Sequence, residues 1–436
     1  MPRFLVAICL ALTTSTLRAQ ATRPAATIDG FDPHRLARID STVQHYVDDH
    51  RIAGAVGLVM RDGKVVYEKA FGWSDREANR RMTTDAVFRI ASQSKAITSV
   101  AALMLVEEGK INLSDPVSRW IPTFAHTTVA VRRDSTKPAS DSNRVIVPAR
   151  RRITIRDLLT HTSGMSYGGE PIIIHLYAEK GLGYGRNAYG WYTADKDEPI
   201  CATMERLGTL PFVQQPGAAW VYGYNLDVLG CVIERASGQP LDEFIRERIT
   251  KPLGMRDTYF FLPKNQRARL AAVYTPDDSG RVSRAPDGPM GQGDYVDGPR
   301  RNFSGGAGLL STAHDYARFL EMLRNDGILD GRRYLAPHTV ALMRTNQVGN
   351  LHYPDGRLGF GLGFETTERY GANGMSSVGT FSWSGAYSST YKVDPKERLV
   401  ICLMVQVVPS PAGGIKEAFD TAVYQALVDA SGSREP

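Results

Sequence analysis

One stretch decides how the chain is read: Phe88-Arg89-Ile90-Ala91-Ser92-Gln93-Ser94-Lys95-Ala96-Ile97. It runs from an apolar approach into a predicted helix that begins at Ser92. Residues three apart share one face of a helix, so the amine of Lys95 can act as the base for the Ser92 hydroxyl once burial favours its neutral form. The positive end of the helix lies where negative charge would develop on a substrate. The stretch therefore predicts a serine nucleophile on the first turn of a core helix that ends at Gly109.

Two other matches to serine motifs serve as internal controls. Ser389 and Lys392 also stand three apart, but they fall in a run that reads as a strand, where such residues point to opposite faces. Ser166 lies in a Gly-x-Ser-x-Gly pattern, the signature of a nucleophile elbow. An elbow needs a buried strand before it and a helix after it, whereas a helical stretch precedes this one and Gly-Glu-Pro follows. Ser92 is therefore the predicted nucleophile.

Residues 1–19 have the features of a secretory signal peptide. Arg3 gives a positive start, residues 4–12 form an apolar run too short to span a bilayer, and residues 17–19 offer a cleavage site. No later stretch has the unbroken apolar length of a membrane span. We expect residues 20–436 to form one secreted or periplasmic domain with an inserted helical lobe.

The composition argues against several classes of function. The formal charge is only +6, and the basic residues are scattered apart from Arg150-Arg151-Arg152, which is typical of a solvated loop rather than a nucleic-acid surface. The nine histidines show no ligand-spaced pair, and no phosphate-binding loop is present. We expect no metal, cofactor or nucleic-acid partner, and a small-molecule ester or amide as substrate.

Three cysteines remain after the expected cleavage: Cys201, Cys231 and Cys402. In an oxidising compartment Cys201 and Cys231 could pair. Three scattered cysteines are nevertheless no disulfide framework, so buried free thiols are the expected state.

The apolar pattern predicts secondary structure at both ends of the chain that belongs together. The expected elements are a helix over 33–50, a hairpin over 55–60 and 64–71, a mainly helical middle with a connective polar loop over 126–152, strands over 381–393 and 399–405, and a closing helix over 415–428. This order predicts an α+β fold in which both ends share one sheet and a helical lobe lies between them.

Further candidate residues lie beyond the helix that begins at Ser92. Tyr222 follows a Pro-Gly pair, and a phenol near a cationic lysine can relay a proton to a leaving group. The alternative is a core or rim tyrosine, as most of the 19 tyrosines must be. Gly305-Gly306-Ala307-Gly308 permits a close backbone approach, and residues 167–199 have the Gly- and Tyr-rich composition of a substrate-covering segment.

Taken in order, these motifs resemble those of the penicillin-recognising serine hydrolases: class C beta-lactamases, DD-peptidases and their esterase relatives. The matching motifs within residues 52–429 are Ser92-Gln93-Ser94-Lys95, Leu158-Leu159-Thr160-His161-Thr162-Ser163-Gly164 and Pro216-Gly217 with Tyr222. The resemblance implies an antiparallel sheet flanked by terminal helices, plus a mainly helical lobe. It also implies an acyl-enzyme on Ser92, acid and base work shared by Lys95 and Tyr222, and an oxyanion hole from the N–H groups of Ser92 and Ala386.

The chain departs from the lactamase pattern at two motifs. The second motif usually reads Tyr-x-Asn, but here Tyr224 takes the third position and Asn225 follows. The third motif usually begins with lysine or histidine, but here it reads Trp383-Ser384-Gly385. Both departures are similar to the esterase branch. The predicted substrate-binding residues are the members of these two motifs: Trp383, Ser384, Gly385, Tyr224 and Asn225.

The expected activity is therefore hydrolysis of short esters. A lactamase or carboxypeptidase binds a substrate carboxylate, and Trp383 offers that group no positive charge. Two alternatives stay open. One is a class C-type beta-lactamase or D-alanyl-D-alanine carboxypeptidase in which an arginine such as Arg301 replaces the missing cation. The other is a non-catalytic penicillin-binding or sensor domain.

Overall fold

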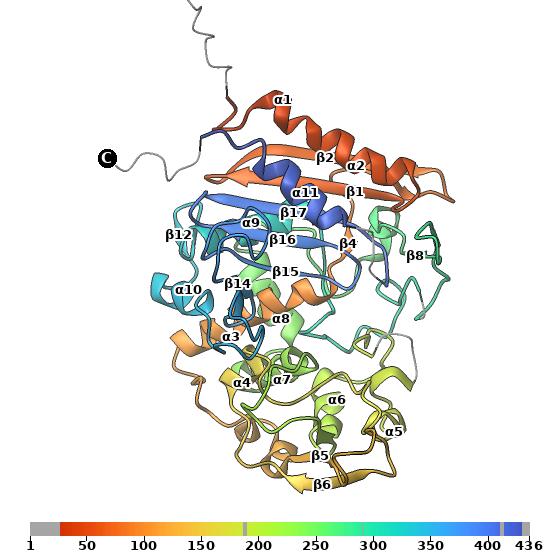
Figure 1. Ribbon diagram of the computed structural model, residues 1–436, viewed down its shortest axis with the longest axis vertical. Helices are drawn as coiled ribbons and strands as arrows, with labels where there is room; N and C mark the ends of the chain where they lie inside the picture. The colour runs from red at the N-terminus through yellow and green to blue at the C-terminus, as the bar shows by residue number, and fades with distance from the viewer. Residues whose placement is uncertain (1–26, 186–189, 290, 410–413, 430–436) are drawn as a thin grey trace, which may run out of the picture.

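The two ends of the chain build one sheet together. The computed structural model describes residues 27–185, 190–289, 291–409 and 414–429. Its main sheet has eight strands in the order β13-β14-β15-β16-β17-β1-β2-β3, and neighbouring strands are antiparallel (Figure 1). The pairing of β1 with β17, which sets Leu58 opposite Cys402, joins the N-terminal and C-terminal strands. The expected signal peptide, residues 1–19, lies outside the described residues.

The strand bounds confirm the early hairpin and correct the late one. The strands are β1 (Gly54–Arg61), β2 (Lys64–Asp75), β3 (Arg80–Arg81), β13 (Leu358–Phe360), β14 (Glu365–Thr367), β15 (Phe381–Ser384), β16 (Thr390–Asp394) and β17 (Leu399–Met404). Asp62 and Gly63 both have positive φ, as a tight Asp-Gly turn requires. The expected single strand over 381–393 is wrong, because the chain reverses at residues 385–389, where Ser388 has a φ of +72°.

Helices cover both faces of the sheet (Figure 1). On one face lie α1 (Pro33–Leu36), α2 (Arg38–Asp48) and α11 (Ile415–Tyr424). The expected helix over 33–50 is divided at Ala37, and α2 buries Ile39 and Val43 against the sheet layer. On the other face α9 (Ala313–Arg324) packs against β17 and β1. The part of the chain that the structure describes holds no helix long and apolar enough to cross a membrane.

The middle of the chain forms the lobe below the sheet (Figure 1). Its helices are α4 (Ile155–Leu159), α5 (Ile174–Glu179), α6 (Ile200–Leu207), α7 (Asn225–Ser237) and α8 (Leu241–Ile245). The expected connective loop over 126–152 is in fact a hairpin of β5 (Thr128–Arg132) and β6 (Arg144–Pro148), and β7 (Pro211–Phe212) pairs with β5. Both strands are short, and the turn between them is flanked by Arg132 and Arg144, so their few apolar residues are easily taken for part of a polar loop.

The lobe contains a disulfide between Cys201 of α6 and Cys231 of α7, with an S–S distance of 2.07 Å. The expectation of free thiols is therefore wrong for this pair. Its partners meet because α6 and α7 pack side by side, which spacing along the sequence does not reveal. Cys402 is a buried free thiol, as expected.

Several short elements complete the fold. They are β4 (Phe88–Arg89), β8 (Tyr274–Pro276), β9 (Val282–Arg284), β10 (Leu310–Ser311), β11 (Ile328–Leu329), β12 (Arg332–Arg333) and α10 (Pro337–Met343). The pairing of β4 with β10 matters most for the site. It brings the residues that precede Ser92 beside the glycine-rich segment that precedes Leu310.

Candidate active site

Ser92 lies in a tight turn directly after β4. The turn is a 3-10 helix over Ala91–Gln93, and α3 (Ser94–Glu107) continues from it, so the α-helix begins two residues later than expected. Ala91 has a φ of +41°, in the left-handed region that residues with a side chain rarely adopt outside functional turns. The turn leaves Ser92 partly exposed, whereas Lys95 is only 1% exposed.

The amine of Lys95 is surrounded by oxygen atoms. Its Nζ lies 3.2 Å from Ser92 Oγ, 3.1 Å from Tyr167 Oη and 2.8 Å from Gly306 O. The ring of Tyr222 covers it, with the ring centre 4.6 Å away. Within the described part of the chain no carboxylate lies within ion-pair distance of Lys95. An amine held in this way against a serine hydroxyl has the geometry of a general base.

Two tyrosines, Tyr222 and Tyr167, contact the Lys95 amine, whereas the sequence predicts such a contact for Tyr222 alone. The Tyr222 hydroxyl accepts a hydrogen bond from Trp383 Nε1 at 3.1 Å. The contact between Tyr222 and Lys95 is made by the face of the tyrosine ring. The hydroxyl that reaches Lys95 belongs to Tyr167. Burial, and next the neighbouring Tyr222, raise the pKa of Tyr167 well above its ordinary value, which keeps the hydroxyl protonated.

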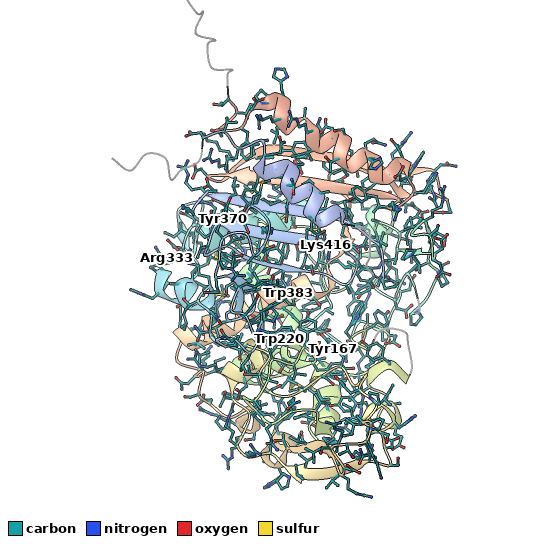
Figure 2. All side chains as sticks on the ribbon, viewed as in Figure 1. Tyr167, Trp220, Arg333, Tyr370, Trp383 and Lys416 are labelled. Atoms are coloured by element: carbon teal, nitrogen blue, oxygen red, sulfur yellow. A yellow bond between two sulfur atoms is a disulfide. The ribbon has the colours of Figure 1, made fainter. Side chains whose placement is uncertain are left out.

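In the sequence Tyr167 stands out only as the first residue of the Gly- and Tyr-rich segment 167–199, with no role predicted for it at Lys95. The signal that points to it is its place three residues after Gly164, the last residue of the Leu158–Gly164 motif. Figure 2 shows Tyr167, Trp220 and Trp383 gathered between the sheet and the lobe.

The third motif ends β15 beside the nucleophile turn. A Cβ on Gly385 would lie 2.5 Å from Ile90 O, so only glycine permits this approach. The next residue, Ala386, is partly exposed. The fold thus brings the two predicted oxyanion-hole residues, Ser92 and Ala386, onto adjoining segments.

Tyr224 and Asn225 are buried in the framework behind the site. Tyr224 is 1% exposed, and its hydroxyl accepts from Gly183 N–H at 3.0 Å and donates to Gly190 O. Asn225 is fully buried, with its amide nitrogen 3.0 Å from His161 Nδ1. The chain turns into α7 at this point and carries both side chains inward. Both side chains therefore hold neighbouring segments together in this structure, and their assignment to substrate binding stays a prediction.

The two motif matches that served as controls form no serine–lysine pair. The Ser166 hydroxyl donates to Glu170 at 2.6 Å. The Ser389 hydroxyl donates to Val405 O at 2.8 Å, while Lys392 forms an ion pair with Asp420 of α11 at 2.7 Å.

The surroundings of Trp383 and Ser384 carry no excess of positive charge. A pocket of about 290 Å³ beside them is lined by Lys392 and Lys416. The same pocket is lined by three acidic residues: Glu365, Glu417 and Asp420. Arg301, the sequence candidate for a replacement cation, instead pairs with Asp197 at 3.2 Å and is largely exposed.

Aromatic side chains surround the other faces of Trp383 and Tyr222. An aromatic wall, formed by Trp220, Tyr222, Phe360 and Trp383, has ring centres 5.4 to 6.2 Å apart in its closest pairs. From Trp220 and Tyr222 a groove of about 720 Å³ extends to β5. Most of its lining is apolar and includes Val129, Val131, Ile172 and Val213.

Comparison with known proteins agrees with this geometry. Residues 39–425 match the family model described as Beta-lactamase. Esterase EstB of Burkholderia gladioli is 34% identical over 406 residues, which cover 89% of this chain and 95% of EstB. The lovastatin esterase of Penicillium rubens is 30% identical over 413 residues, which cover 89% of this chain and 98% of that enzyme.

The solved structure of "EstCE1, a hydrolase with promiscuous acyltransferase activity" superposes with a TM-score of 0.75 at 28% identity. The match covers 90% of this chain and 99% of EstCE1. The expected beta-lactamase-like α+β fold is thereby confirmed. The chain belongs to the beta-lactamase family of serine hydrolases, in the branch whose similar named members are esterases and acyltransferases.

Proposed function

We propose that the protein is a carboxylesterase that cleaves short-chain esters through an acyl-enzyme on Ser92. The observation that carries the proposal is the 3.2 Å contact between Lys95 Nζ and Ser92 Oγ at a partly exposed turn. The esterase names of the similar proteins support the reaction class.

In the proposed mechanism Lys95 takes the proton of the Ser92 hydroxyl as its oxygen attacks the ester carbonyl. The N–H groups of Ser92 and Ala386 hold the negative charge that forms on the carbonyl oxygen. A tyrosine of the Lys95 network returns a proton to the departing alkoxide. A water molecule then attacks the acyl-enzyme with the same groups in reversed roles, which releases the acid and restores Ser92.

The substrate preference follows from charge. Trp383 can offer a substrate only apolar surface, because its single N–H is bonded to Tyr222. The two lysines of the adjoining pocket are outnumbered by its three acidic residues. A substrate carboxylate would thus be buried without compensation, whereas a neutral ester can place an apolar group along the aromatic wall or in the groove beside Tyr222.

The test is a kinetic comparison of 4-nitrophenyl butyrate and a chromogenic cephalosporin on the same preparation, with Ser92→Ala as the blank. We expect kcat/KM for the ester to exceed that for the cephalosporin by a wide margin. A larger kcat/KM for the cephalosporin would overturn the ester preference and favour the lactamase alternative.

Covalent labelling of Ser92 distinguishes an esterase from a non-catalytic binding domain. An active-site serine phosphonate should modify Ser92 in the folded protein and stop ester turnover in proportion. Labelling without any turnover in the untreated protein would favour the binding domain, and no adduct on Ser92 would contradict the assignment of the nucleophile.

We further propose that the chain is exported and loses residues 1–19. The signal-like N-terminus supports this, as does the disulfide between Cys201 and Cys231, since disulfides persist mainly in oxidising compartments. N-terminal sequencing of protein recovered outside the cytoplasm should begin at Gln20. Recovery only in the cytoplasm with Met1 retained would contradict it.

A further inference from the structure

A buried carboxylate, Asp227, lies behind Lys95 on the first turn of α7. It is 1% exposed, and its Oδ1 accepts hydrogen bonds from the Ser304 hydroxyl and, at 3.2 Å, from Gly306 N–H. The carbonyl of the same glycine accepts from Lys95 Nζ at 2.8 Å. One glycine therefore connects the carboxylate to the amine that contacts Ser92.

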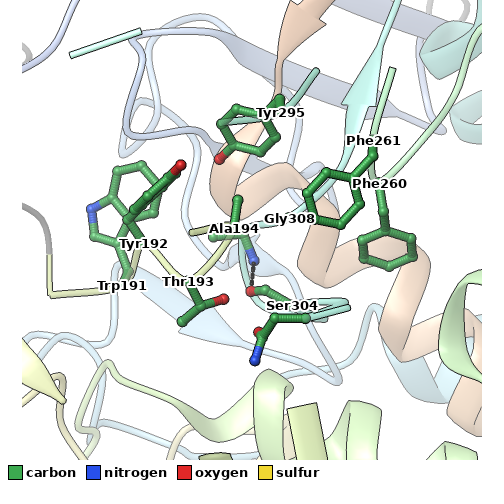
Figure 3. A pocket seen from close by; sticks show the side chains of 11 residues that line it. Trp191, Tyr192, Thr193, Ala194, Phe260, Phe261, Tyr295, Ser304 and Gly308 are labelled. Carbon is green, nitrogen blue, oxygen red and sulfur yellow. Dashed lines mark hydrogen bonds between the residues drawn. The ribbon is translucent and has the colours of Figure 1, made fainter. Parts of the chain in front are cut away.

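The turn that carries Gly306 is fixed between two helices. The Thr98 hydroxyl of α3 donates to Gly305 O at 2.8 Å. A Cβ on Gly306 would lie 2.4 Å from Asp227 Oδ2, so a side chain at this position would displace the carboxylate. Ser304 accepts from Ala307 N–H at 3.0 Å beside a small pocket (Figure 3). Glycine at position 306 therefore permits the close approach of Asp227 to the turn that contacts Lys95.

The charge of Asp227 is compensated only in part. Among the described residues no arginine, lysine or histidine forms an ion pair with it. Burial raises the pKa of Asp227, whereas the Lys95 ammonium, then the Ser304 hydroxyl and Gly306 N–H, lower it. The buried Asp227 carboxylate and the Lys95 ammonium therefore attract each other across the Gly306 peptide.

The other titratable groups that face Lys95 and Asp227 are three tyrosines and one histidine. Tyr167 and Tyr222 face Lys95, and Tyr224 lies near Asp227; the raised pKa values of Tyr167 and Tyr224 keep those phenols neutral. Burial, and next the Lys95 charge, hold the pKa of His161 well below its ordinary value, so that ring is also neutral.

We propose that Asp227 is a positioning residue that sets the pH at which Lys95 can take the proton of Ser92. Its hydrogen bonds hold the Gly306 carbonyl on the amine, and its negative charge delays the loss of the lysine proton. The inference rests on the proposed function, because acyl transfer through Ser92 is the reaction that needs Lys95 in its neutral form.

The test is the pH dependence of kcat/KM for Asp227→Asn, which keeps the size and the Oδ1 acceptor but removes the charge. We expect the ascending limb to move to lower pH by about one unit, the scale of one partly screened charge interaction, with the high-pH plateau largely retained. Asp315→Asn is the matched control. Asp315 is a buried carboxylate that accepts from Asp257 N–H and the Thr258 hydroxyl elsewhere in the core, and its removal should leave the limb in place.

Ser304→Ala provides a second variant should Asp227→Asn fail to fold. Loss of its hydroxyl destabilises the carboxylate form of Asp227, so the limb should move in the same direction by a smaller amount. The inference would be overturned if the ascending limb of kcat/KM stayed at the same pH in every folded variant. It would also be overturned if the high-pH value of kcat/KM collapsed while the midpoint of the limb stayed in place.

The pH dependence of phosphonate labelling on Ser92 gives the same information without ester turnover. Should the parent hydrolyse no ester, the proposed function fails while the labelling profile still tests Asp227. If the parent is active but Asp227→Asn shifts neither the labelling profile nor the kcat/KM profile with pH, the inference about Asp227 is wrong and the proposed function stands.

Discussion

The indole N–H of Trp383 donates to the hydroxyl of Tyr222 over 3.1 Å. The head of the third motif, where lactamases carry a cation, is therefore a hydrogen-bond donor to the second motif. Because a tyrosine oxygen can accept from Trp383 and still donate its own proton, the contact orients the Tyr222 hydroxyl without blocking it.

The contact between Trp383 and Tyr222 can be tested by removing only its donor. Trp383→Phe keeps an aromatic ring in the wall, and we expect kcat/KM to fall by roughly tenfold, the usual value of one hydrogen bond. The matched control is Trp220→Phe, because the buried Nε1 of Trp220 has no hydrogen-bond partner in the described structure. Equal losses in the two variants would show that ring size, rather than the hydrogen bond, is what matters.

The assignment of the nucleophile predicts opposite results for two serines. Ser92→Ala should abolish ester hydrolysis, because the serine hydroxyl beside Lys95 is lost. Ser166→Ala should retain most of the activity, since that hydroxyl is bonded to Glu170. Initial rates with a nitrophenyl ester decide, and loss of activity in the Ser166 variant alone would favour the nucleophile-elbow interpretation.

The two tyrosines around Lys95 are expected to be needed together. Tyr167→Phe and Tyr222→Phe should each lower kcat on the order of 10², the usual scale for a positioned acid or base. Tyr177→Phe is the control, since that buried hydroxyl makes one long contact of 3.4 Å with Pro211 O. A Tyr222→Phe variant with parental kcat would leave Tyr222 a purely structural role.

Stability should depend on the disulfide of the lobe. It closes a loop of 30 residues, so replacing both Cys201 and Cys231 by serine should lower the free energy of unfolding by about 3.6 kcal/mol. Reductant should lower the denaturation midpoint of the parent and of Cys402→Ala, but not that of the double variant. A parent that is insensitive to reductant under unfolding conditions would contradict this expectation.

A second stability prediction concerns acid. Hydrogen bonds from Arg206 hold the pKa of Glu198 at about 2. A carboxylate with a lowered pKa stabilises the fold at neutral pH and loses that contribution as pH falls from about 4 to about 2. Glu198→Gln should therefore cost about 1 kcal/mol at pH 7, a value limited by partial exposure, and nothing at pH 2.

Glu179→Gln is the control for the acid prediction, since Glu179 is an exposed glutamate of the same lobe without an ion pair in the described structure. Denaturant melts of both variants and the parent at several pH values give the comparison. A pH-independent difference between Glu198→Gln and the parent would contradict the assignment.

The sequence predicts best what depends on local spacing. The contact of Ser92 with Lys95 follows from one turn of helix, and the α+β order follows from apolar periodicity at the two ends of the chain. The exact start of α3 does not follow, because the turn at Ala91, with its positive φ, comes directly after β4, whose partner β10 is more than 200 residues away. The family assignment, made from ordered motifs, is confirmed by the comparisons.

Tertiary placement of loop residues is what sequence patterns miss. Tyr167 reaches Lys95 from a segment 72 residues away, and the only local signal for it is its place shortly after the Leu158–Gly164 motif. In the sequence Asp227 is indistinguishable from any acidic residue on the first turn of a helix. Only the structure shows its hydrogen bond with Gly306 N–H. Tyr224 and Asn225 lie close to Tyr222 in sequence, yet the start of α7 directs them into the core.

The pairing of β1 with β17 dictates when the protein can finish folding during its synthesis. The first hairpin leaves the ribosome with one edge of β1 open, and its partner emerges only after almost the whole chain has been made. Such distant pairing slows folding and exposes an apolar strand edge to other chains. A truncation that removes β17 therefore leaves the sheet without its centre, so the newly made protein depends on its last segment to protect its first.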